Sequence, residues 1–172
     1  MSKVQKLALA GLFVALDIVF ARFLSFYLPD PVSRTVRVSP QFLAHALSGW
    51  MLGPLWAAVS ALAGDMLGML VNSGGLVFQP GFSISFALSG AIYGLALHRR
   101  EVRWQNALIA VSAVTIPISL LLNSIWLHLL YKAATYTYIV TALPWRLLTI
   151  PIYFVLLIAV QKGILRSSVI KR

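Results

Sequence analysis

The sequence predicts an all-α integral membrane protein, in which residues 1–172 form one domain, a bundle of six transmembrane helices. Three observations carry this prediction. The chain is 60% hydrophobic, its mean hydropathy is +0.88, and only 10% of its 172 residues are charged. Soluble domains are about 45–50% apolar and about 25% charged. Because so few charges cannot form a polar shell, lipid must cover most of the surface. With roughly 20 residues per span, the length allows about six spans.

The first half of the chain divides into three helices at its prolines. A first helix over residues 4–27 ends before Pro29 and Pro31, since proline terminates helices. Lys3 and Lys6 precede the apolar run over residues 7–28 as in a signal peptide, but no small-x-small cleavage site follows, so we expect a retained span. The short second helix, residues 40–52, starts at a proline, which is favourable there. Gly53-Pro54 separates it from the third helix, residues 55–71.

Three longer apolar blocks follow in the second half. We expect a fourth helix over residues 82–97, a charged connector, a fifth helix over residues 106–131, a Tyr/Thr-rich connector over residues 132–141, and a sixth helix over residues 143–165. A transmembrane β-barrel would need alternating segments of about ten residues. The stretches 107–118 and 150–160 are continuously apolar instead, which favours helices.

The basic residues predict the orientation of this bundle. Nine of the fourteen Lys and Arg residues flank the start of the first helix, lie between the fourth and fifth helices, or lie at the end of the chain. An even number of spans brings these three regions to one side, and cytoplasmic loops are enriched in Lys and Arg. We therefore expect both termini in the cytoplasm of a multi-pass protein of the cell membrane.

Several function classes are disfavoured. The chain has no cysteine, which excludes disulfides, thiol catalysis and Cys-based metal sites. It has no phosphate-cradling Gly-x-x-x-x-Gly-Lys-Ser/Thr motif, and its three histidines lack metal-ligand spacing. We expect neither an enzyme nor a cofactor or metal. The net charge of +10 would suggest a nucleic-acid partner in a soluble protein, but here the basic residues flank apolar blocks, so we expect none.

The other five basic residues do not lie on the predicted cytoplasmic side, and two of them, Arg34 and Arg37, share one outer loop. Arginine binds carboxylates through two parallel hydrogen bonds, so this pair could form an anion site. The alternative is a solvated loop whose arginines touch lipid phosphates. We weigh the two equally for Arg34 and favour an anion site for Arg37, which is nearer a helix start.

Ionisable residues within spans are costly and usually have a role. Asp17 and Arg22 are five apart on the first helix, so they do not face each other and should find partners on other helices. Asp65 lies between glycines in Gly64-Asp65-Met66-Leu67-Gly68. A structural Asp65–Arg146 ion pair is one possibility, and a ligand contact for Arg146 is the other; for Asp65 we favour the structural role.

Aromatic and amide side chains gather toward the outer side. Asn123 and Trp126 are three apart and share one face of the fifth helix, and Phe82 follows Pro80-Gly81. A flat heteroaromatic ligand needs stacking rings and a few amide partners. Interfacial aromatic residues are the alternative, and we prefer it for Trp145, Tyr136 and Tyr138. Asn123 is less easily explained that way, because an amide in an apolar helix normally needs a partner.

Small residues form a stripe on the first helix at Ala8, Gly11 and Ala15. Such stripes let helices approach closely in lipid. Two interpretations stay open: packing within the bundle, or docking onto another membrane protein.

The chain resembles the substrate-binding S components of energy-coupling factor (ECF) vitamin transporters, most closely the folate type. The resemblance covers nearly the whole chain. It rests on Leu52-Gly53-Pro54, the Gly64–Gly68 segment, Ser73-Gly74-Gly75, Phe78-Gln79-Pro80-Gly81-Phe82-Ser83, Asn123-Ser124-Ile125-Trp126-Leu127 and Pro144-Trp145-Arg146. The first-helix stripe is similar to the family's docking motif. Two positions differ from the folate-type pattern: Thr149 stands where Lys is frequent, and Gln79 interrupts a Phe-Pro-Gly.

This resemblance implies a high-affinity vitamin-binding subunit of an ATP-driven importer. It implies docking on a transmembrane coupling protein, EcfT, which is driven by two cytoplasmic ATPases. For folate it places Arg34 and Arg37 at the carboxylates and Phe82, Ser85, Asn123, Trp126 and Arg146 at the ring or linker. A second interpretation keeps the family and changes the ligand to pantothenate, a pyrimidine, a queuosine precursor or a corrinoid. A membrane assembly protein without a small ligand is the alternative from another class.

Overall fold

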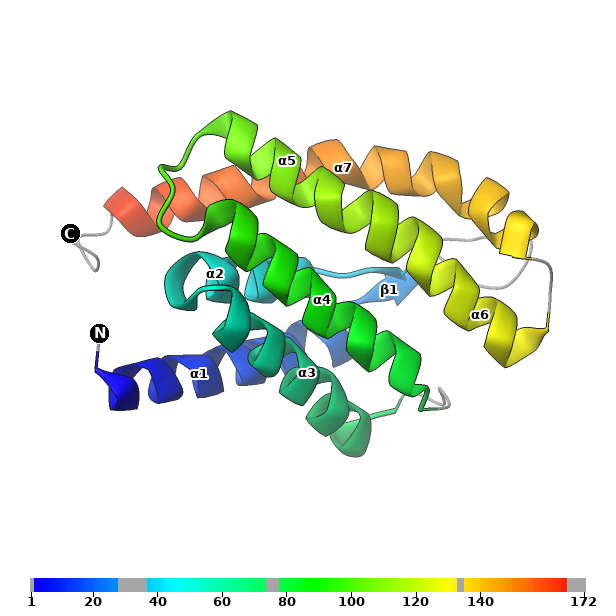
Figure 1. The fold of residues 1–172 in the computed structure, drawn as a ribbon, viewed down its shortest axis with the longest axis horizontal. Helices are drawn as coiled ribbons and strands as arrows, with labels where there is room; N and C mark the ends of the chain where they lie inside the picture. The colour runs from blue at the N-terminus through cyan, green and yellow to red at the C-terminus, as the bar shows by residue number, and fades with distance from the viewer. Residues whose placement is uncertain (1, 28–36, 74–77, 133–134, 167–172) are drawn as a thin grey trace.

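The computed structural model describes residues 2–27, 37–73, 78–132 and 135–166. Most of this part of the chain is helical, which confirms the predicted fold class (Figure 1). The elements in chain order are α1 (Lys3–Arg22), β1 (Phe26–Tyr27), β2 (Arg37–Val38), α2 (Gln41–Leu52), α3 (Pro54–Val71), α4 (Pro80–Leu97), α5 (Trp104–Val114), η1 (Thr115–Leu122), α6 (Asn123–Tyr131) and α7 (Thr135–Arg166).

Five helices are long and apolar enough to cross a membrane: α1, α3, α4, the continuous α5–η1–α6 segment, and α7. The sixth expected span, α2, has 12 residues, so at 1.5 Å per residue it is about 18 Å long. The hydrocarbon core of a bilayer is about 30 Å thick. The bundle therefore has the six predicted helices, one of which is too short to cross the hydrocarbon core by itself.

Two boundaries differ clearly from the prediction. The first helix ends at Arg22 rather than near residue 27, because residues 26–27 form a short antiparallel pair with residues 37–38. The sixth helix starts at Thr135, so the predicted connector over residues 132–141 was wrong for most of its length. Pro144 and Pro151 both lie inside this helix. In lipid an unpaired backbone group is costly, which favours an extended helix over a loop. Prolines are tolerated within such a helix because neighbouring helices and side chains satisfy the backbone groups that they free.

The fifth expected helix is continuous, but its middle is a π-helix, η1, which contains Pro117. Proline has no backbone N–H to donate, and π-helical turns are a known way for a helix to absorb such a local fault. The turn also resets the rotation of α6 relative to α5, which determines the direction in which the side chains of α6 point.

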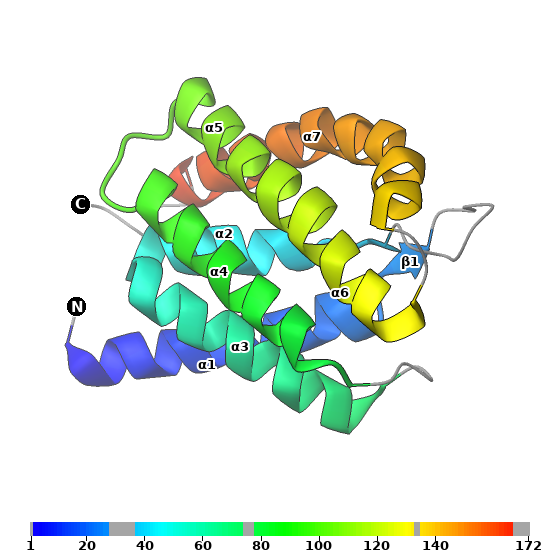
Figure 2. The same cartoon turned by 45° about the vertical axis from the view of Figure 1, so that its right-hand side comes forward.

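Different structural elements lie at the two ends of the bundle. Figures 1 and 2 show that the start of α1 and the end of α7 lie at one end, together with the α4–α5 connection, whereas the β1–β2 pair lies toward the other. This arrangement agrees with an even number of passes. We call these the terminal end and the hairpin end; the cytoplasmic location of the terminal end stays a prediction.

The main core lies between α2, α4, α5 and α7. It contains Phe42, Tyr93, Val111 and Leu157, and the rings of Phe42 and Tyr153 stack with their centroids 3.9 Å apart. Helices α3 and α4 are in close contact, because a Cβ on Gly94 would collide with the backbone of Pro54. Close backbone approach at small residues is the usual basis of helix association in lipid.

Candidate functional site

A buried ion pair joins α1 to α3 in the half of the bundle near the hairpin end. Arg22 Nη2 lies 3.3 Å from Asp65 Oδ1, and the two side chains are only 5% and 8% exposed. The hydroxyl of Ser83 on α4 donates a 2.6 Å hydrogen bond to Asp65 Oδ2. Asp65 therefore links three helices. The possible Asp65–Arg146 pair is not what the structure shows, since Arg22 occupies that position beside Asp65.

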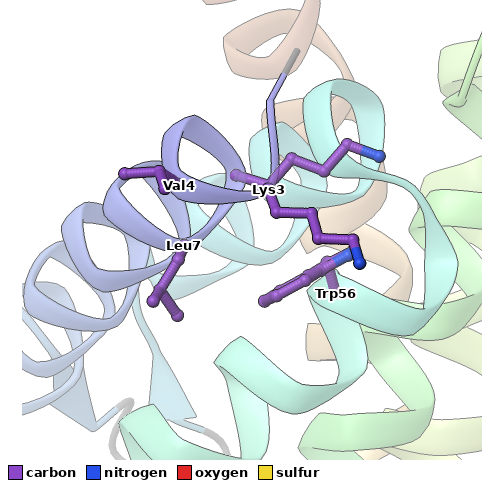
Figure 3. A pocket seen from close by; sticks show the side chains of 5 residues that line it. Lys3, Val4, Leu7 and Trp56 are labelled. Carbon is purple, nitrogen blue, oxygen red and sulfur yellow. The ribbon is translucent and has the colours of Figure 1, made fainter.

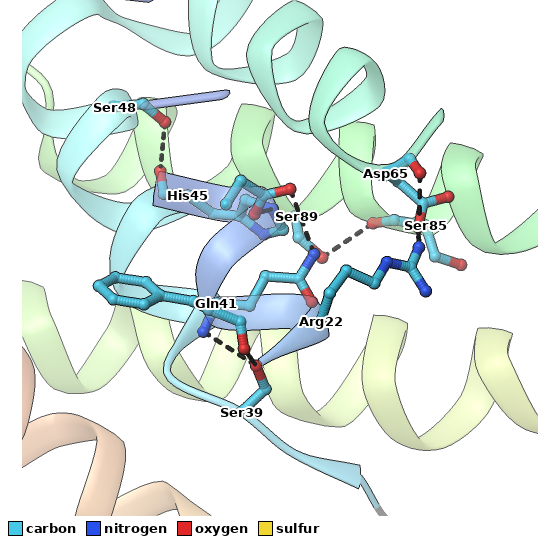
Figure 4. A network of polar contacts seen from close by, with 10 residues as sticks. Arg22, Ser39, Gln41, His45, Ser48, Asp65, Ser85 and Ser89 are labelled. Atoms are coloured by element: carbon cyan, nitrogen blue, oxygen red, sulfur yellow. Dashed lines mark hydrogen bonds and ion pairs between the residues drawn. The ribbon is translucent and has the colours of Figure 1, made fainter. Parts of the chain in front are cut away.

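A second polar contact joins α1 to α2. Asp17 Oδ1 lies 2.8 Å from Nε2 of His45, and the amide of Gln41 donates a 3.3 Å hydrogen bond to Asp17 Oδ2. Figure 4 shows Gln41, His45, Arg22 and Asp65 in one network between the helices. The expectation that Asp17 and Arg22 find partners on other helices is confirmed.

Sequence reasoning missed His45 and Gln41 as members of this network. The available signal was their spacing of four residues on a short helix, which puts both polar side chains on one face. That signal shows that the two residues share a face, but not which neighbouring helix the face contacts.

The glycines around Asp65 make room for the charged side chains of α1. A Cβ on Gly64 would overlap the carboxylate of Asp17, and one on Gly68 would lie 3.0 Å from Nε of Arg22. The Gly64–Gly68 segment thus lets α3 lie directly against two ionisable side chains that must stay away from lipid.

The side chain of Trp126 is held between α6 and the first turns of α4. Its Nε1 donates a 3.0 Å hydrogen bond to Ser85 Oγ, and Gln79 Nε2 donates to its backbone carbonyl at 3.4 Å. The indole lies against Gly81, where any Cβ would overlap the ring. Trp126 remains partly exposed. The result is a rigidly placed aromatic surface, part of which is accessible.

Helix α4 is held on both sides at this point. Ser83 and Ser85 are two residues apart, so on a helix of 3.6 residues per turn they face nearly opposite directions. Ser83 reaches Asp65 on α3, and Ser85 reaches Trp126 on α6. The ion pair of α1 and α3 is therefore connected, through one turn of α4, to the position of the Trp126 ring.

Asn123 begins α6, one helical turn before Trp126 and directly after the π-helical turn. Its Oδ1 is buried and has no hydrogen-bond partner among the residues that the structure describes. Buried polar atoms are nearly always hydrogen-bonded, so an unsatisfied amide oxygen needs an explanation. A bound ligand that donates a hydrogen bond would supply one.

The other predicted residues are distributed as follows. Phe82 is partly buried on α4, three residues before Ser85, and Arg146 is partly buried on α7, a helix that packs against α6 and η1. Trp145, next to Arg146, packs against the cluster of Leu120 and Ala142, and the interfacial role expected of it stays a prediction. The structure thus links Ser85 and Trp126 directly and places Asn123 and Phe82 within a turn of them.

Two predicted residues fall wholly or partly outside the described part of the chain. Arg34 lies outside it. The backbone of Arg37 is described and pairs with Tyr27 in the β1–β2 ladder, but its side chain is not. Their suggested binding of carboxylates stays a prediction.

The small-residue stripe of α1 lies on the outer surface. Ala8, Gly11 and Ala15 are all exposed, and no atom of the described residues outside the neighbouring turns of α1 lies within 4 Å of a Cβ placed on Gly11. Packing within this bundle therefore does not account for the stripe. Docking onto another membrane protein stays a prediction.

Comparison with known proteins gives one consistent result. A family model described as "ECF transporter, substrate-specific component" matches residues 5–161. A protein of Clostridium novyi named folate transporter FolT is 31% identical over 172 residues, which cover 100% of this chain and 96% of the relative. A protein of the same name from Leuconostoc mesenteroides is 28% identical over 131 residues, 76% of this chain and 67% of the relative.

A solved structure is also similar in fold. It is the crystal structure of FolT bound with folic acid, which superposes with a TM-score of 0.82 and 28% sequence identity. The match covers 96% of this chain and 94% of the solved one. The likeness therefore includes all the helices that carry the residues described above.

Proposed function

Because the chain belongs to the family of substrate-specific components of ECF transporters, we propose that it is the high-affinity folate-binding subunit of an ATP-driven vitamin importer. One observation carries the choice of folate. The likeness to proteins named for folate, one of them holding folic acid, runs along the whole chain and includes the helices that form the Trp126–Ser85 contact.

The chemistry of the candidate site suits this ligand. Folate has a flat pterin ring with several hydrogen-bond donors and a glutamate with two carboxylates. A fixed indole such as Trp126 offers an aromatic face, and the unsatisfied Oδ1 of Asn123 offers a buried acceptor. Phe82, Ser85 and Arg146 complete the set proposed for the ring and linker. Arg34 and Arg37 are proposed to bind the carboxylates.

The proposal includes partners that supply energy. The chain would bind folate at the hairpin end and dock through Ala8, Gly11 and Ala15 onto the coupling protein EcfT, which two cytoplasmic ATPases drive. The exposure of this stripe supports the docking role, because small side chains allow a partner helix to approach closely.

Folate titration of the purified chain tests the ligand. We expect saturable quenching of tryptophan fluorescence in detergent at submicromolar folate, with pantothenate giving no response. A response to pantothenate, a pyrimidine, a queuosine precursor or a corrinoid instead of folate would keep the family role and overturn the ligand. No response to any of them would favour the membrane assembly protein.

Arg37→Ala is expected to weaken folate binding by about tenfold or more, because a charge-assisted hydrogen bond contributes roughly 1.5–3 kcal/mol. A pterin without carboxylates should bind the variant and the unchanged protein equally. Isothermal titration with both ligands measures this difference, and Arg103→Ala, whose side chain is exposed at the terminal end, is the matched control. Equal losses for the two ligands would rule out a carboxylate role for Arg37.

A further inference from the structure

A hollow of about 430 Å³ opens at the terminal end of the bundle, between the first turns of α1 and α3. Lys3, Val4, Lys6, Leu7 and Trp56 line it. Figure 3 shows Lys3, Val4 and Leu7 extending from α1, and the ring of Trp56 facing them from α3. This hollow is far along α1 from Arg22 and Asp65, and none of the residues proposed for folate lines it.

The polar groups around the hollow have no partners within the described part of the chain. Among the described residues, Lys3 and Lys6 form no ion pair, and Nε1 of Trp56 forms no hydrogen bond. The described carboxylates are engaged elsewhere: Asp17 and Asp65 are buried toward the hairpin end, and Glu101 pairs with Arg103 at 2.7 Å. Two positive charges and one N–H donor thus border a space with no carboxylate of the described residues left to pair with them.

The length of α1 places the hollow at the level of lipid headgroups, if α1 crosses the bilayer along its whole length. Helix α1 has 20 residues, so it is about 30 Å long, which matches the hydrocarbon core. Its first turn, with Lys3 and Lys6, therefore lies at the boundary of the membrane. Val4 and Leu7 are 77% and 64% exposed, which suits contact with acyl chains and not with water.

We propose that this hollow binds the headgroup of an anionic phospholipid from the leaflet at the terminal end. The phosphate lies between the ammonium groups of Lys3 and Lys6, and the indole N–H of Trp56 donates to one of its oxygens. The first carbons of an acyl chain lie along Val4 and Leu7. A basic cluster next to an interfacial tryptophan is the arrangement expected for such recognition.

The test compares two lipids on the whole protein. The delipidated chain in detergent is titrated with phosphatidylglycerol or phosphatidylcholine, and bound lipid is counted by native mass spectrometry. We expect phosphatidylglycerol to bind at least tenfold more tightly. The double variant Lys3→Gln/Lys6→Gln should lose this preference. Lys162→Gln, at an exposed lysine of α7 toward the same end, should keep it.

Further outcomes separate the lipid from other occupants. Trp56→Phe should weaken phosphatidylglycerol binding a few-fold, and millimolar inorganic phosphate should not displace the lipid. Displacement by inorganic phosphate would overturn the lipid assignment in favour of a free anion. Equal lipid binding by the double variant and the unchanged protein would also overturn it. The same holds if the double variant lost binding to the coupling protein but still bound the lipid. Folate binding and the melting temperature of the double variant should be unchanged, so this proposal can fail independently of the proposed function.

Discussion

Asp65→Ala is expected to lower the free energy of unfolding by about 3–5 kcal/mol, the usual cost of removing one partner of a buried ion pair. The variant deprives Arg22 of its carboxylate, 3.3 Å away, and Ser83 of its acceptor, 2.6 Å away. Both groups lie between helices, where water cannot replace the lost partner. Unfolding in mixed micelles with increasing denaturing detergent measures the change.

Two controls separate the ion pair from a general effect of losing a charge. Asp65→Asn keeps the shape of the side chain but removes the charge, and should cost less than the alanine variant. Glu101→Ala removes a carboxylate from a pair whose side chains are 75% and 66% exposed, and should change stability little, because exposed pairs contribute little. If Asp65→Ala cost no more than Glu101→Ala, the network would have no structural importance.

Trp126→Ala is expected to weaken folate binding by about 30-fold or more, which corresponds to roughly 2 kcal/mol, the level of a central aromatic contact. The variant removes the aromatic surface that Gly81 and Ser85 hold in place. Because it also leaves a cavity next to α4, its melting temperature is measured alongside the folate titration by calorimetry.

Three matched variants show what the indole contributes. Trp126→Phe keeps a ring and loses the N–H, so an intermediate loss is expected. Ser85→Ala keeps the indole and removes its acceptor, so a smaller loss is expected. Trp104→Ala, at a side chain 60% exposed at the start of α5, should bind folate normally. Normal folate binding by Trp126→Ala would remove Trp126 from the site.

Composition and hydrophobic blocks were sufficient to predict a helical membrane bundle and the approximate place of each helix. These properties depend only on neighbouring residues in the sequence: the length of each apolar stretch, and the positions at which proline and polar residues interrupt it. The need for partners of Asp17 and Arg22 was predictable for the same reason, because a charge in lipid is costly whatever surrounds it.

The identity of those partners was not predictable. Arg22 pairs with Asp65, and Asp17 with His45, because of the rotation and neighbours of α1, α2 and α3 in the bundle. Likewise, the contact of Trp126 with Ser85 depends on the π-helical turn that resets the direction of α6, and on a glycine at position 81. A sequence shows which face of a helix is polar. Which helix that face meets depends on the packing of the whole bundle, because the interior is close-packed and every helix must fit all of its neighbours at once.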